Sequence, residues 1–248
     1  MADQTFSHFP AIPLPQLQPA PELTVLDPTP CVYLPHHTSR VRAFMAGRLS
    51  PEAHQALMDS GFRRSGRVVY QPLCETCRAC EAIRVPTVTF TPTKSQRRCR
   101  RKNADVSVHV APPEPTPEKH AIYAKYQTQW HTGQQASAME AFVSFLYDSP
   151  VDTLEFVYRD AAGKLLGIGI CDVSSQSLSS VYFYFDPAMA RRGLGTFSVL
   201  YEIEWARQNH IPYWYGGYYV SGCGAMEYKA AFGPHELLGT DGLWRASK

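Results

Sequence analysis

The chain has 248 residues, of which 44% are hydrophobic and 19% are charged. These values are typical of a globular protein with one large domain or two small ones, and they exclude a largely disordered chain. The sequence begins with no cationic start followed by an apolar block, and no run approaches 18 apolar residues, so neither a secretory signal nor a transmembrane helix is predicted. We therefore expect a cytoplasmic protein whose seven cysteines stay reduced.

The net charge of +2 conceals an uneven distribution along the chain. Between Gly61 and Lys102 there are eleven Lys or Arg residues against Glu75 and Glu81, a local charge of +9, so the other residues together carry −7. Such a separation favours a polyanionic partner that docks on the Gly61–Lys102 segment.

The first half of the chain divides by composition. Proline is frequent in residues 1–30 and predicts an extended N-terminal arm. Residues 31–110 form a Cys- and Arg-rich region, in which Arg67–Gln71 and Ile83–Phe90 have the pattern of strands. The stretch 111–117, APPEPTP, is predicted to be a linker.

The domain expected over residues 118–248 starts with helices and continues mainly with strands. Thr116 is a suitable N-cap, and Pro117 suits the first helical position. The periodicity predicts, in order, a helix to about Trp130, a helix at Met139–Tyr147, strands at Leu154–Arg159, Leu165–Val173 and Ser179–Phe185, a helix at Leu194–Asn209, a strand at Tyr213–Val220, a short helix at Met226–Phe232 and a last strand from Glu236.

The run KSQRRCRRK has six cationic residues among nine: Lys94, Arg97, Arg98, Arg100, Arg101 and Lys102. Each cation that neutralises a phosphate releases counterions, and arginine binds phosphate oxygens in a bidentate manner. No acid offsets this charge within residues 82–104, so we favour a nucleic-acid backbone as the partner over the alternative of a solvated charged face.

Three cysteines, Cys74, Cys77 and Cys80, follow each other with C-x2-C-x2-C spacing. Thiolates that converge in this way bind Zn²⁺ or an iron–sulfur cluster. A fourth ligand is then needed, for which Cys31 is the first candidate and Cys99 the second. The alternative is a set of small buried hydrophobic residues or free thiols.

A GxG segment, Gly193-Leu194-Gly195, lies between a predicted strand and an amphipathic helix. Glycines at that point let backbone N–H groups approach a phosphate at the start of the helix. A hairpin, a strand, a GxG helix and a further strand are the order typical of a GNAT acyltransferase core. The usual GNAT signature has Arg or Gln three residues before the first glycine, where this chain has Ala190, which speaks against the standard coenzyme A grip.

The aromatic stretch Tyr213–Tyr219 contains the flexible pair Gly216-Gly217. Such aromatic side chains stack on the terminal adenine of a tRNA or line an aminoacyl pocket. The alternative is a buried strand packed on the helix at Leu194–Asn209. We expect alternate residues of the stretch to contact the substrate and to pack in the core.

Taken together, these segments resemble the bacterial leucyl-tRNA–protein transferases, relatives of the eukaryotic arginyl enzymes. The resemblance covers most of the chain in the order of that family. The matching stretches are CVYLP (31–35), GFRRSGRVVYQPLCETCRAC (61–80), FTPTKSQRRCRRKNAD (90–105), VYFYFDPAMARRGLGTFSVLYEIEWAR (181–207) and IPYWYGGYYVSGCGAMEYKAAFGPHELL (211–238).

The resemblance implies an α+β fold, in which a GNAT-like core with a mixed twisted sheet follows the N-terminal Cys/Arg-rich region. It implies transfer of leucine from leucyl-tRNA to proteins that begin with Asp or Glu, which marks them for N-degron proteolysis, without coenzyme A or another organic cofactor. We expect a monomer. The alternatives are an arginyl-tRNA–protein transferase, a coenzyme A-dependent N-acetyltransferase and a non-enzymatic zinc-knuckle protein that binds RNA.

Residues for each step follow from this hypothesis. For catalysis, Asp186 at the end of its strand is the candidate proton acceptor, and Tyr182 and Lys229 are further candidates. The tRNA is expected to contact the six cations of the run at 94–102 together with Arg191, Arg192, Gly193 and Gly195.

The acidic N-terminal residue needs a cation, and the sequence offers Arg64, Arg67, Arg192 and Lys229 without separating them. Tyr218 and Tyr228 are expected to line the substrate pocket.

Overall fold

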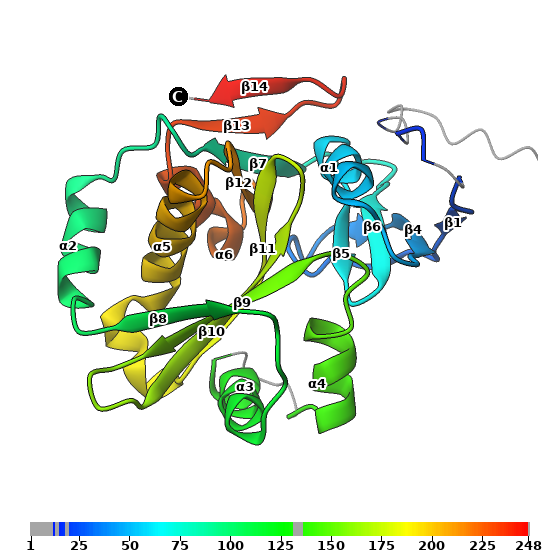
Figure 1. Ribbon diagram of the computed structural model, residues 1–248. Helices are drawn as coiled ribbons and strands as arrows, with labels where there is room; N and C mark the ends of the chain where they lie inside the picture. The colour runs from blue at the N-terminus through cyan, green and yellow to red at the C-terminus, as the bar shows by residue number, and fades with distance from the viewer. Residues whose placement is uncertain (1–11, 13–14, 18–19, 131–135, 248) are drawn as a thin grey trace, which may run out of the picture.

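The computed structural model describes residues 12, 15–17, 20–130 and 136–247 (Figure 1). Much of the predicted N-terminal arm lies outside the described residues. The helices are α1 (Pro51–Asp59), α2 (Lys94–Lys102), α3 (Pro117–Gln129), α4 (Met139–Leu146), α5 (Leu194–Gln208) and α6 (Gly224–Glu227), with short 3-10 helices η1 (Pro187–Arg192) and η2 (Tyr228–Ala231).

The predicted α+β class is confirmed by a mixed sheet of eight strands that runs through the molecule. Its strands, from one edge to the other, are β14 (Trp244–Ser247), β13 (His235–Leu238), β7 (Cys80–Pro86), β12 (Tyr213–Val220), β11 (Ser177–Phe185), β10 (Leu165–Val173), β9 (Thr153–Arg159) and β8 (Ser107–Ala111). The predicted order of hairpin (β9–β10), strand (β11), helix (α5) and strand (β12) is also confirmed.

The remaining strands form two smaller sheets. One is made, in order, of β1 (Thr24–Val25), β4 (Val41–Met45), β6 (Val68–Pro72) and β5 (Arg63–Ser65), and the other of β2 (Thr29–Pro30) and β3 (Thr38–Ser39). The stretch 111–117 does connect β8 to α3. However, β7 and β8 belong to the large sheet, so the Cys/Arg-rich region and the domain after the linker share one sheet.

Helices cover both faces of the large sheet, with α5 on one and α3 on the other (Figure 1). Alternation along β11 explains this arrangement, because successive side chains of a strand point to opposite faces. Tyr182 and Tyr184 pack against Tyr123 of α3, whereas Phe183 packs against Tyr158, which contacts Phe197 of α5. The main hydrophobic core therefore lies on both sides of β9, β10 and β11.

β11 and β12 pair in parallel only at Ser177–Ser179 against Tyr213–Tyr215. Beyond these residues β12 continues to pair with β7, and an irregularity between Tyr215 and Tyr218 shifts its register. Gly217 lies within that irregularity at a φ of 78°, a left-handed conformation that glycine adopts without strain. The two neighbouring strands thus separate in the middle of the sheet.

A buried ion pair joins the four-stranded sheet, which contains β5, to the eight-stranded sheet. Arg64 on β5 donates from Nε and Nη2 to the two carboxylate oxygens of Asp172 on β10, both at 2.6 Å, and the two side chains are 2% and 1% exposed. Thr153 on β9 donates to the same carboxylate. An ion pair that is buried and bidentate keeps both charges satisfied without water.

No helix of the described residues combines the length and apolar character needed to cross a bilayer.

Removal of one partner of the buried Arg64–Asp172 pair should destabilise the fold. We expect Arg64→Gln to lower the free energy of unfolding by about 3–5 kcal/mol, because Asp172 is left buried without its counterion. The control is Arg48→Gln, which breaks the exposed pair with Asp152 and should cost at most about 1 kcal/mol. Urea unfolding measures both, and equal losses in the two variants would contradict the role given to the buried pair.

Glu202 on α5 is a second buried carboxyl, completely shielded from solvent. The Nε1 atom of Trp214 donates to it at 2.8 Å, but burial raises its pKa from 4.5 to about 7. In the unfolded chain the carboxyl ionises near its ordinary pKa, while the folded protein keeps the proton up to about pH 7. The contribution of Glu202 to stability is therefore present at low pH and is lost as pH rises between these two values.

Glu202→Gln removes this titration. Relative to the unsubstituted protein, the variant should gain stability between pH 5 and pH 8, by about 1.4 kcal/mol for each unit of pKa shift that is removed. Glu204→Gln, on the exposed side of the same helix, is the control and should show no such gain. Urea unfolding at the two pH values tests the idea, which fails if the Glu202→Gln difference is the same at both.

Candidate functional site

A cavity of about 660 Å³ opens where β11 and β12 separate. Its walls come from both strands, from β5, from the first turns of α5 and from the segment of α6 and η2. Five residues predicted for catalysis or substrate binding line it, namely Arg64, Tyr182, Tyr218, Tyr228 and Lys229. The cavity is therefore the place where the predicted site residues from distant parts of the sequence converge.

The polar side chains of this cavity carry an excess of positive charge. Among the described residues that line it, Asp172 is the only acid, and Arg64 neutralises it. Burial lowers the pKa of His54 to about 4, so the imidazole is neutral near pH 7. Arg63 and Lys229 lie in the same wall, and neither forms a salt bridge with a described residue.

Lys229 is held in place by backbone rather than by an acid. Its Nζ donates to the carbonyl of Tyr218 at 2.8 Å, and the side chain is nine-tenths buried. Burial and the nearby Arg63 lower its pKa from 10.5 to about 7. An ammonium in such a position is stabilised by any anion that enters the cavity.

Aromatic rings form the opposite wall. Tyr126 and Trp130 are stacked with centroids 6.3 Å apart, and Phe185 meets both rings edge to face. Tyr182 meets Tyr126 in the same way. Burial raises the pKa of Tyr182, so its hydroxyl keeps its proton and acts as a donor. This wall offers flat surfaces of the kind on which a base stacks.

The basic run at Lys94–Lys102 forms helix α2, which the sequence analysis did not predict as a helix. Its six cations are all exposed, whereas Gln96 is buried and Cys99 half-buried. Cys99 Sγ lies 3.4 Å from the carbonyl of Gly193, and Asn103 donates to the carbonyl of Arg192 at 3.0 Å. The structure thus joins the two groups predicted to contact tRNA, the basic run and the GxG segment.

The GxG segment also reaches the cavity. Gly193 ends η1 and precedes α5 without a side-chain cap, and Gly195 and Ser198 of the first turns of α5 line the cavity. Uncapped N–H groups at the start of a helix favour an anion. Arg192 pairs instead with Asp105, and Arg191 lies beside α2, where its carbonyl accepts from Lys102.

Two of the residues predicted for catalysis or substrate binding, Asp186 and Arg67, do not line this cavity. Asp186 accepts a hydrogen bond from Ala188 N and pairs with Lys164 at 3.1 Å. Burial raises the pKa of this carboxyl, but the two donors outweigh it and lower the net value, which makes Asp186 a weak base that caps a turn. Arg67 pairs with Asp148 at the surface.

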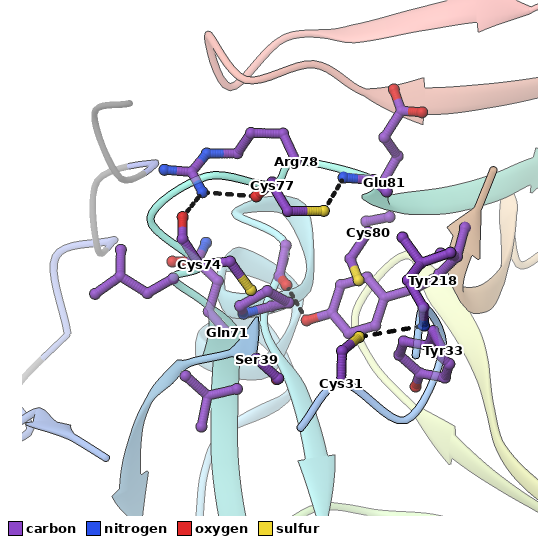
Figure 2. A pocket seen from close by; sticks show the side chains of 18 of the residues that line it. Cys31, Tyr33, Ser39, Gln71, Cys74, Cys77, Arg78, Cys80, Glu81 and Tyr218 are labelled. Atoms are coloured by element: carbon purple, nitrogen blue, oxygen red, sulfur yellow. Dashed lines mark hydrogen bonds between the residues drawn. The ribbon is translucent and has the colours of Figure 1, made fainter. Parts of the chain in front are cut away.

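The cysteines predicted as metal ligands, Cys31, Cys74, Cys77 and Cys80, line a second cavity of about 270 Å³ (Figure 2). The backbone N–H groups of Leu34 and Ala79 donate to the sulfurs of Cys31 and Cys77. However, within the described part of the chain no three Cys, His, Asp or Glu side chains are arranged around one ion position. The metal site stays a prediction.

Sequence reasoning missed Arg63 as a site residue. Arg63 and Arg64 are adjacent on β5 and differ in tertiary partners alone: Arg64 meets Asp172, while Arg63 donates to the carbonyls of Phe62 and Gly217. The dipeptide contains no signal that separates the two arginines.

Known proteins match the chain over nearly its whole length. Two family models match, described as arginine-tRNA-protein transferase, N terminus, over residues 29–98 and C terminus over residues 118–239. The chain is 39% identical to the aspartate/glutamate leucyltransferase of Methylobacterium sp., covering 91% of this chain and 96% of the relative. It is 37% identical to the enzyme of that name from Gluconobacter oxydans, covering 88% and 91%.

Solved structures are more distant. FemX has a TM-score of 0.48 at 9% identity, covering 87% of this chain and 85% of that chain. The L-PGS of Bacillus licheniformis has a TM-score of 0.45 at 16% identity, covering 73% and 54%. The matches in sequence, by contrast, are close and extend over both halves, and they place this chain in the arginine-tRNA-protein transferase family, together with the aspartate/glutamate leucyltransferases.

Proposed function

We propose that the protein transfers leucine from leucyl-tRNA to the N-terminal Asp or Glu of other proteins in the cytoplasm, and so marks them for N-degron proteolysis. The observation that carries the proposal is the cavity between β11 and β12. Buried cations, aromatic rings and the first turns of α5 all line this cavity. The relatives are named as leucyltransferases that act on aspartate and glutamate, and the family is named for tRNA, which supports leucyl-tRNA as the donor and an acidic residue as the acceptor.

The tRNA would lie along α2 and reach the cavity with its 3′ end. The exposed cations of α2 suit the phosphates of an acceptor arm. Because α2 packs beside Gly193, a strand of RNA leaving α2 meets the start of α5 next. The uncapped N–H groups there suit a terminal phosphate, and the rings of Tyr126 and Trp130 suit the terminal adenine.

The reaction is aminolysis of an ester that is already activated. The α-amine of the acceptor protein attacks the leucyl carbonyl carbon, the bond from this carbon to the ribose oxygen breaks, and the ribose oxygen takes up a proton that the amine releases. A protein α-amine has a pKa of about 8, so roughly a tenth is free at pH 7. Holding it near the carbonyl supplies much of the acceleration, and the protonated hydroxyl of Tyr182, which lines the cavity, would donate to the developing oxyanion.

The direct test uses radiolabelled leucyl-tRNA and peptides that begin with Asp or Glu. We expect label to appear on both peptides and to be absent when the tRNA is digested with RNase beforehand. Label from arginyl-tRNA instead would assign the arginyl specificity for which the family is named. Acetyl transfer from acetyl coenzyme A without RNA would replace the proposal by an acetyltransferase, and label from no donor would end it.

The role of α2 is tested by Arg97→Gln combined with Arg98→Gln. We expect KM for leucyl-tRNA to rise, and the slope of log affinity against log salt to fall by about one for each cation removed. The control is Arg245→Gln on β14, whose guanidinium pairs with Asp241. An unchanged salt dependence in the double variant would place the RNA elsewhere.

We also keep the proposal that Cys31, Cys74, Cys77 and Cys80 bind Zn²⁺ or an iron–sulfur cluster. Four thiols around one cavity, two of them accepting backbone N–H donors, support it. Metal and sulfide analysis of anaerobically purified protein decides between zinc, a cluster and free thiols, and Cys77→Ser should lower the bound metal.

A further inference from the structure

We propose that Arg63 and Lys229 together hold the side-chain carboxylate of the acceptor protein's N-terminal Asp or Glu. This inference rests on the proposed function and names the residues that select the acceptor. Both side chains line the cavity between β11 and β12, and each is 9% exposed.

The irregular part of β12 places these two cations side by side. Arg63 Nη2 donates to the carbonyl of Gly217 at 3.1 Å, and Lys229 Nζ donates to the carbonyl of Tyr218 at 2.8 Å. Consecutive carbonyls of one strand thus hold groups that come from β5 and η2. A Cβ atom at Gly217 would lie 3.6 Å from Lys229 Nζ, an ordinary van der Waals contact, so it is the φ of 78° that favours glycine here.

Neither cation has an acidic partner among the described residues. Arg63 Nε is buried without a hydrogen-bond partner among those residues, and the guanidinium lies 5.5 Å and 5.4 Å from the ring centres of Tyr215 and Tyr218. Within the described part of the chain, Lys229 Nζ donates only to the carbonyl of Tyr218 and to the sulfur of Met226. An unpaired buried donor costs about 1–3 kcal/mol, and more when it is charged. A carboxylate bound in the cavity beside Arg63 and Lys229 would compensate their buried positive charge.

The other cations that the sequence offered for this role are occupied. Arg64 is bound by Asp172, Arg67 by Asp148 and Arg192 by Asp105. Of the four candidates, Lys229 alone forms no salt bridge with a described residue. The structure adds Arg63, which lines the same cavity and lies near enough to Lys229 to lower the pKa of its ammonium.

A protein carboxylate fits this position better than an RNA phosphate does. Phosphates along a tRNA meet exposed cations of the kind that α2 presents. Arg63 and Lys229 instead lie in the wall of the cavity, where a small planar anion is enclosed and water is removed. In such surroundings the neutral amide of Asn or Gln leaves two charges unpaired, so the site discriminates by charge.

The test compares three peptides that differ only in the first residue, which is Glu, Gln or the γ-methyl ester of Glu. With the unsubstituted protein, kcat/KM for Glu should exceed that for the other two at least about tenfold. Arg63→Gln and Lys229→Gln should each lower this preference by a similar factor, through KM for the peptide. KM for leucyl-tRNA should stay the same.

The control is Arg48→Gln, an exposed arginine that does not line the cavity, which should keep the full preference. Arg63→Lys retains the charge but loses the Nε donor. Its preference for Glu should lie between that of Arg63→Gln and that of the unsubstituted protein. The methyl ester requires no substitution in the protein, so this comparison remains decisive if a variant fails to fold.

Three outcomes overturn the inference while leaving the proposed function intact. The first is equal transfer to Glu and its methyl ester, and the second is an unchanged preference in both folded Gln variants. The third is a rise in KM for leucyl-tRNA instead of for the peptide, which would assign the two cations to RNA. If the unsubstituted protein labels none of the peptides from leucyl-tRNA, the proposed function itself fails.

Discussion

The arrangement of the site depends on one ion pair, that of Arg64 with Asp172. It joins β5 of the small sheet to β10 of the large one, with both side chains shielded from solvent. It also consumes the only acid among the described residues that line the cavity. Because that carboxylate is already occupied on both oxygens, the charges of Arg63 and Lys229 stay uncompensated. The same contact that joins the two sheets therefore leaves the positive charge that we propose binds the acceptor's carboxylate.

The strands and helices after the linker were predictable because each has a strong local pattern. Residues Leu165–Val173 and Tyr213–Val220 form strands with the predicted bounds, and the helix predicted at Leu194–Asn209 ends one residue earlier. Helix α2 was not predicted, since a run of cations has no apolar periodicity to mark a buried face. Its signal was at the start, where Thr93 and Gln96 form a capping box.

The site was predictable to the level of residue type and region. Tyr182, Tyr218, Tyr228 and Lys229 were named from motif positions, and they do line one cavity. What the sequence did not contain is the choice of partners among the charges. Asp186 has the position of a base at the end of a strand, but Lys164 and Ala188 N take up its oxygens. Such choices depend on contacts between residues that are distant in sequence, and no local pattern records them.

The two cationic surfaces of the protein differ in a way that suits two kinds of substrate. The cations of α2 are exposed, so salt screens them over about 8–10 Å and their hold on a polyanion is strong only when many phosphates engage at once. Arg63 and Lys229 are buried, so salt screens them little and a single carboxylate is enough to engage them. With the roles proposed above, higher salt should weaken tRNA binding before it weakens selection of the acceptor. This difference in salt dependence follows from burial. The exposed cations of α2 suit a polymer of high charge density, whereas the buried Arg63 and Lys229 suit a single charged residue.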